Sequence, residues 1–127
     1  MTMVLEAKKH KMRQEVAHWA EKIGVKPKRI QIQRMTAKWA SCSTAGRVCF
    51  SADLLDEPSA FQEVVIVHEL LHLLVPNHGK LFKSLMKAHL PGWERVARER
   101  EVTICGGSEA HVEIHKTKSV DRRKRGE

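Results

Sequence analysis

The segment of residues 61–75 constrains this chain most, because it is apolar almost throughout yet carries two histidines and a glutamate. A helix that is apolar on all sides is buried. His68 and His72 are four residues apart, which places both imidazoles on one face of such a helix. Glu69 follows His68, close to that face. The spacing His-Glu-x-x-His is typical of zinc hydrolases, in which two histidines bind the ion and the glutamate acts on a water.

Local signals predict where this helix begins and ends. Ser59 and Gln62 have the spacing of a capping box, and Pro58 precedes them. Pro76 ends the helix, because proline disfavours helical backbone in the residue before it. We expect the chain to turn back there and to present His78 to the face that carries the other two histidines.

A histidine on an apolar helix is often a hydrogen-bonded core residue, and this alternative has to be weighed. Here three histidines and a glutamate share one buried helix and the turn that follows it. Burial of a carboxylate without a partner is expensive. A metal ion supplies a partner for all four groups, so we predict one Zn²⁺ per chain, with His68, His72 and His78 as ligands.

Three neutral imidazoles leave zinc one open position for water, and zinc lowers the pKa of that water to about 7. Glu69 would take a proton from this water and pass it to the leaving group, which makes it the candidate catalytic base. The chain contains no tyrosine that could stabilise an oxyanion. Arg34, Lys38, His89 and backbone N–H groups remain candidates for that role.

Several segments resemble a known family, the YgjP-like metallopeptidase domain, which is related to the small gluzincin and SprT-like zinc proteases. The similar pieces are Arg34, Lys38-Trp39-Ala40-Ser41-Cys42, Gly46-Arg47-Val48-Cys49-Phe50-Ser51, Leu54, Pro58, the helix at 64–72 and Asn77-His78-Gly79-Lys80-Leu81-Phe82. Ala40 replaces the family's usual glycine, and Leu71 replaces a residue that is often small. The resemblance implies a zinc-dependent peptidase-like fold with the same three ligands and the same base.

The segment around Trp39 supplies a second group of candidate site residues. A tryptophan beside small residues usually belongs to the core. Residues 44–46 read as a hairpin turn between two strands within 38–52. Because the family resemblance places this hairpin near the metal helix, both packing and a place in the cleft remain open. The candidate cleft residues are Arg34, Lys38, Trp39, Ser41 and Cys42.

Hydrophobic periodicity predicts the remaining elements. An amphipathic helix is expected near residues 3–23, with Val4 and Leu5 among its inward residues, and a strand over 28–36. A helix over 79–90 and a short helix over 93–101 follow. These elements predict an α+β fold, a small antiparallel sheet packed against helices, as a single metallohydrolase domain at residues 1–107. Residues 108–127 are predicted to form a polar, basic C-terminal tail.

Length and cysteine content narrow the class of protein further. A chain of 127 residues is one domain. Its three cysteines are odd in number and lack C-x-x-C spacing, so we expect reduced thiols and a cytoplasmic protein. The sequence shows no signal peptide and no run of apolar residues long enough for a membrane span, so no membrane association is expected.

The leading prediction is a peptidase that acts on peptides or proteins, but the distribution of charged residues is also compatible with two other functions. Residues 1–47 hold eleven Lys/Arg against three acidic residues, a basic surface that attracts anions, although a solvated face is the simpler interpretation. The alternatives are a zinc-dependent phosphohydrolase acting on nucleotides and a non-catalytic, zinc-stabilised nucleic-acid-binding module. Structural zinc sites usually have four protein ligands, many of them cysteines, so three histidines and a glutamate favour catalysis. The oligomeric state is not predicted.

Overall fold

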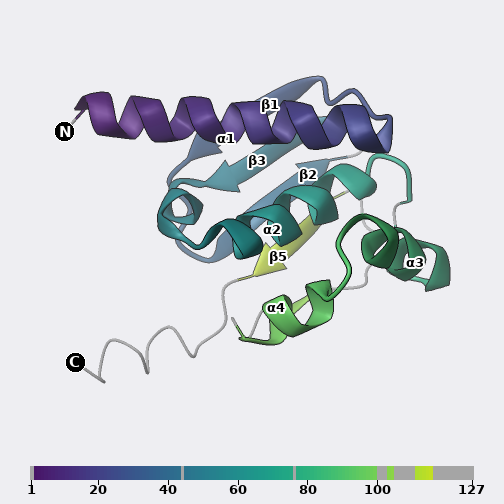
Figure 1. The fold of residues 1–127 in the computed structure, drawn as a ribbon. Helices are drawn as coiled ribbons and strands as arrows, with labels where there is room; N and C mark the ends of the chain where they lie inside the picture. The colour runs from purple at the N-terminus through teal and green to yellow at the C-terminus, as the bar shows by residue number, and fades with distance from the viewer. Residues whose placement is uncertain (1, 44, 76, 100–102, 105–110, 116–127) are drawn as a thin grey trace.

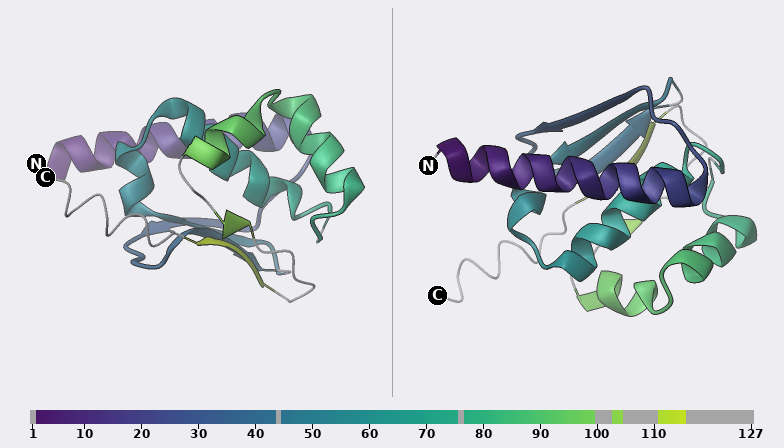
Figure 2. Two further views of the ribbon diagram at one scale, coloured as in Figure 1. Left: turned by 90° about the horizontal axis from the view of Figure 1, so that it is seen from below. Right: turned by 45° about the horizontal axis from the view of Figure 1, so that its top comes forward.

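The helices of this molecule cover one face of a small sheet, as the computed structural model shows (Figure 1; Figure 2). The structure describes residues 2–43, 45–75, 77–99, 103–104 and 111–115. The elements are α1 (Thr2–Ile23), β1 (Arg29–Gln33), β2 (Lys38–Ser43), β3 (Arg47–Ser51), the 3₁₀ helix η1 (Ala52–Asp56), α2 (Ser59–Leu71), α3 (Lys80–His89), α4 (Trp93–Glu99), β4 (Thr103–Ile104) and β5 (His111–His115). The predicted α+β class is confirmed.

The five strands have the order β1-β3-β2-β5-β4. β2 and β3 form the predicted hairpin, and the pairs β2–β5 and β4–β5 are also antiparallel. β1 runs parallel to β3, with Ile30 opposite Val48. The sheet is therefore mixed and not wholly antiparallel as predicted. The reason is that β3 returns between β1 and β2, so that β1 lies beside the second strand of the hairpin and not beside its own successor.

β5 lies inside the segment that the sequence assigned to a basic tail. Its residues pair with β2 over the register from Lys38 opposite His115 to Ser43 opposite His111. The signal for a strand was weak, because only Val112 and Ile114 alternate with polar residues in an otherwise polar region. The remainder of the predicted tail, 116–127, and Cys105 lie outside the described residues.

α1 packs through one stripe of its surface. Met12, Val16 and Trp19 recur at the helical period and are buried. Gly24, with a φ of +89°, ends the helix in the left-handed conformation that glycine adopts without strain. Val4 and Leu5, which were expected to point inward, are 57% and 40% exposed. The first turns of α1 therefore extend past the core that the later turns cover.

The start of α2 differs from the predicted capping box. Pro58 is the N-cap residue, and the cap makes no side-chain hydrogen bond. The Gln62 amide instead donates to the carbonyls of Leu54, Leu55 and Glu57, which belong to η1 and its end. Gln62 thus ties α2 to the preceding 3₁₀ helix. Among the described residues, no helix combines the length and apolar content needed to cross a membrane.

Candidate metal centre

The end of α2 places three imidazoles around one point. α2 stops at Leu71, before the predicted limit at Val75, and His72 is its C-cap residue. The following turn returns the chain so that His78 Nε2 lies 3.0 Å from His68 Nε2 and 2.8 Å from His72 Nε2. Ligand atoms bound tetrahedrally to one zinc at its usual bond lengths are about 3.3–3.4 Å apart. The three rings are thus already close to the spacing that a metal ion requires.

Burial keeps these imidazoles neutral, which is the state that binds a metal. It lowers the pKa of His68 from 6.5 to about 3. The pKa of His72 also falls to about 3, mainly through burial and then through His68, and that of His78 to about 4. For His78, burial is again the largest cause, followed by His68 and by the positive charge of Lys83. All three side chains therefore offer lone pairs at neutral pH.

Hydrogen bonds orient two of the three rings. His72 Nδ1 lies 3.0 Å from the carbonyl oxygen of Val75, to which it donates. His68 Nδ1 lies 3.1 Å from Glu69 Oε2, and both side chains are fully buried. Because a neutral imidazole carries one proton, these bonds leave Nε2 of His68 and His72 as acceptors. This matches the usual metal-binding histidine, whose other nitrogen is bonded to a second group.

The donor set fits a metal ion better than a hydrogen-bonded cluster. Nε2 of His68 and Nε2 of His72 both face Nε2 of His78, which carries at most one proton. That proton can be donated to only one of them, so a purely protein network leaves one contact unsatisfied. A single cation at the common point would satisfy all three lone pairs. Among the described residues, these histidines are also the one group of three or more His, Cys, Asp or Glu residues that could hold a metal ion, with ligand atoms within 4.8 Å of one another.

Two of the predicted cleft residues, Trp39 and Cys42, lie at different positions along α2. Trp39 meets Phe61 edge to face at 5.2 Å, near the start of the helix. Cys42 is buried further along β2, where burial and then the Glu69 carboxylate raise the pKa of its thiol to about 12. Cys42 therefore lies near Glu69 as an uncharged thiol, whereas Trp39 belongs to the packing at the opposite end of α2.

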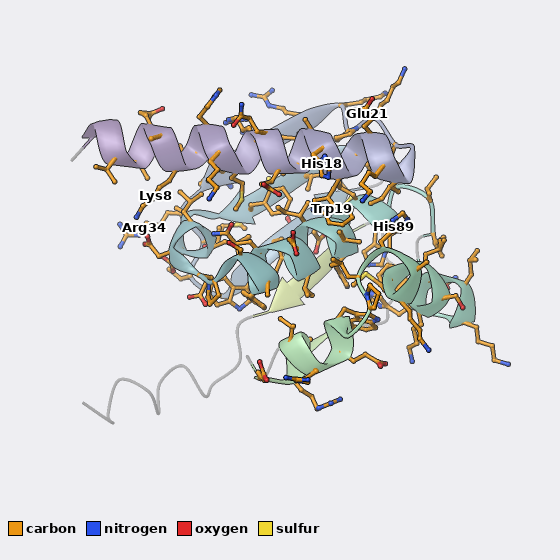
Figure 3. All side chains as sticks on the ribbon, viewed as in Figure 1. Lys8, His18, Trp19, Glu21, Arg34 and His89 are labelled. Atoms are coloured by element: carbon orange, nitrogen blue, oxygen red, sulfur yellow. The ribbon has the colours of Figure 1, made fainter. Side chains whose placement is uncertain are left out.

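The other cleft candidates lie on β2 and just after β1. Ser41 alternates with Cys42 along β2 and is only partly buried, as expected for the outer face of the sheet. Lys38 begins β2, next to Trp39. Arg34 follows β1, and its label in Figure 3 lies toward the end of the molecule where α1 begins, away from the labels of His18 and Trp19. The candidate oxyanion residue His89 instead packs against Trp19, with ring centroids 6.3 Å apart (Figure 3).

One residue of this centre could not be recognised from the sequence. Phe82, on α3, contacts the rings of all three histidines. Phe82 belongs to the segment that resembles the family, but the sequence did not connect its ring to the metal ligands. The available signal was its four-residue spacing from His78, which matters only once α3 is known to pack against the end of α2.

The basic surface predicted to attract anions is partly used within the chain. Lys8 forms an ion pair with Asp56 at 2.6 Å. Arg13 donates to the carbonyl oxygen of Ile30 at 3.0 Å. These two cations therefore tie α1 to η1 and to β1, which gives them a structural role.

Comparison with known proteins identifies the family. The family model of the YgjP-like metallopeptidase domain matches residues 3–101. The chain belongs to this family. The YgjP-like domain also resembles the crystal structure of the metallopeptidase zymogen of Pyrococcus abyssi abylysin, with a TM-score of 0.57 and 16% sequence identity. This match covers 69% of the chain and 93% of abylysin, and at that identity it shows a shared fold.

The comparison with curated proteins found no match to this chain. The family assignment and the histidine group nevertheless agree with each other. A metallopeptidase-type domain requires a metal centre, and the described residues contain a buried three-histidine group that can hold a metal ion. The membership of this chain in a metallopeptidase family points to protein or peptide substrates.

Proposed function

We propose that this YgjP-like domain is a zinc-dependent peptidase in which His68, His72 and His78 hold one Zn²⁺ and Glu69 is the general base. The observation that carries the proposal is the convergence of three neutral ring nitrogens beside a buried glutamate. Zinc suits this set because it binds imidazole well and, with three protein ligands, keeps a fourth position open. No fourth protein ligand belongs to the group within the described residues.

When bound, zinc would polarise the substrate carbonyl and lower the pKa of a water to about 7. The chain's own residues would do the rest. Glu69 would take a proton from the attacking water and pass it to the leaving amine, so that a poor leaving group departs as a neutral amine. His68 would donate to Glu69 Oε2 through Nδ1, which holds the carboxylate beside the site. Cys42, uncharged and buried, would line the wall next to Glu69.

The decisive variant is Glu69→Gln, which keeps the shape of the side chain but cannot accept the proton. We expect about one zinc per chain in both wild type and variant, and a fall in peptide hydrolysis of about 10²- to 10⁴-fold in the variant. The matched control is Glu63→Gln, six residues earlier on α2 and only partly buried. This control should retain both zinc and hydrolysis.

The substrates should include both a peptide panel and a nucleoside triphosphate panel. Hydrolysis of peptides that is lost in Glu69→Gln supports the peptidase. Hydrolysis of nucleotides alone would favour the phosphohydrolase, while wild-type activity in Glu69→Gln would remove Glu69 from the mechanism. The cytoplasmic location and the domain limit at residue 107 stay predictions; among the described cysteines, Cys42 and Cys49 are free thiols.

A further inference from the structure

We infer that Phe82 is a positioning residue of the metal centre: its ring holds the three imidazoles in their converging arrangement and acts most strongly on His78. The inference rests on the proposed metal site and adds to it the residue that orders the ligands. Phe82 would not touch the ion or the substrate.

The ring of Phe82 packs against the rings of all three histidines. It stacks on His72 with a centroid distance of 4.6 Å and an interplanar angle of 14°. It meets His68 edge to face at 5.2 Å and 80°, and His78 edge to face at 4.8 Å and 85°. These are favoured aromatic geometries. Phe82 is 1% exposed, so its own orientation is restricted by packing on every side.

His78 depends on this contact more than the other two ligands do. His68 and His72 lie on or at the end of α2, and each has a hydrogen bond at Nδ1. His78 lies in the turn between α2 and α3, and its buried Nδ1 has no hydrogen-bond partner among the described residues. A metal-binding histidine normally gains its orientation from such a bond. In this site the edge-to-face contact with Phe82 takes its place.

The location of Phe82 also explains how α3 contributes to the site. His78 and Phe82 are separated by a few residues at the start of α3, so that packing of Phe82 against His68 and His72 carries His78 toward them. The ligands are thereby ordered before a metal binds. Ordering in advance strengthens binding because the entropy cost is not incurred at the binding step.

The test is the affinity of purified, metal-free protein for zinc, measured by competition with a chelating dye, in wild type and Phe82→Leu. We expect binding to weaken by about 10- to 100-fold, the usual effect of removing a group that supports a ligand. The matched control is Phe61→Leu. Phe61 is also 1% exposed and also makes an edge-to-face contact, but with Trp39 at the other end of α2. Its variant should keep an affinity close to that of wild type.

Cobalt(II) gives a readout that does not depend on activity. Phe82→Leu should change the visible spectrum of the cobalt-loaded protein, whereas Phe61→Leu should preserve it. Phe82→Tyr, which retains the ring, should bind more tightly than Phe82→Leu. In a His78→Ala background the effect of Phe82→Leu should shrink, because the main ligand that it orders is gone.

Equal zinc affinity and equal cobalt spectra in wild type and Phe82→Leu would overturn the inference while leaving the metal site intact. A wild-type protein that binds neither zinc nor cobalt would overturn the proposed function as well. Circular dichroism of the metal-free variants checks that they fold. If Phe82→Leu does not fold, it is replaced by Phe82→Met, which fills the same space without an aromatic ring. Phe82→Met must then show the same loss of zinc affinity.

Discussion

Both ends of α2 contribute buried side chains to the core, but the two ends differ in the kind of side chain that they bury. At the first end, the ring of Phe61 packs against Trp39. The Gln62 amide donates hydrogen bonds to backbone carbonyls of η1 and of the residue that follows it. At the other end, His68, Glu69 and His72 are 0%, 0% and 8% exposed. Apolar contacts stabilise the fold as they stand, whereas buried polar groups need partners. The first end thus secures the helix in the core, whereas the second end carries the histidines that we propose as metal ligands.

Among the variants that distinguish the roles of the two ends of α2, Phe61→Ala should have the largest effect on the free energy of unfolding. Removal of this buried ring should lower the free energy of unfolding by about 3–5 kcal/mol, through lost burial and the cavity left behind. Zinc affinity should stay near the wild-type value, because the contact partner of Phe61 lies away from the histidines. Denaturant unfolding with chelator and a zinc titration measure the two quantities. A loss of zinc affinity as large as that expected for Phe82→Leu would show that the ends are not independent.

The second expected effect is a dependence of the free energy of unfolding on pH, which arises from the histidines at the end of α2. Burial lowers the pKa of His68 from 6.5 to about 3, so the unfolded chain binds this proton at a higher pH than the folded chain. In metal-free protein, the stability from this group is complete above pH 6.5 and is lost as the pH falls from there toward 3. The expected slope is about 1.4 kcal/mol per pH unit.

Chemical denaturation between pH 7 and pH 4 in the presence of chelator measures this slope. His68→Gln should make it shallower, because the amide does not titrate. His10→Gln, which removes an exposed imidazole on α1, is the control. If His10→Gln reduced the slope as much as His68→Gln does, the result would contradict a specific contribution from the buried histidines.

The smallest expected effect comes from Lys8→Ala, which removes the ion pair with Asp56 at the outer side of η1. Both side chains are well exposed, at 45% and 70%, and pairs of this kind contribute up to about 1 kcal/mol. The loss should shrink at high salt, where screening weakens the pair. Thermal unfolding at low and high salt measures the difference. Zinc affinity should not change, and a change would show that α1 influences the metal end.

The sequence predicted the parts of the site that depend on spacing along one element. His68 and His72 are four residues apart on a helix, and Pro76 marked where the chain turns back to bring His78. The contribution of Phe82 could not be predicted, because it depends on how α3 packs against α2. In the same way, the pattern of Trp39 suggested burial but could not say that it faces Phe61 and not the histidines.

Pairing between strands that are distant in the chain explains where the observed fold differs from the fold predicted from the sequence. The hairpin of β2 and β3 follows from local turn chemistry and was predicted. The parallel pairing of β1 with β3 and the addition of β5 to β2 join segments that are distant in the chain. No local pattern encodes such partners. Gln62 shows the same limit at the scale of one side chain, because its amide reaches back to η1 although its spacing from Ser59 fits a capping box.

The location of β1 at one side of the sheet has a consequence for how copies of this chain meet. As the first strand in the order, it has a neighbour on only one side among the described strands. An open strand edge is a template for self-association. β1 is short, the exposed cations Arg29 and Arg34 lie at its two ends, and Arg13 covers the carbonyl of Ile30. Two such edges would repel each other, so we expect the basic residues around β1 to protect the folded chain from aggregation.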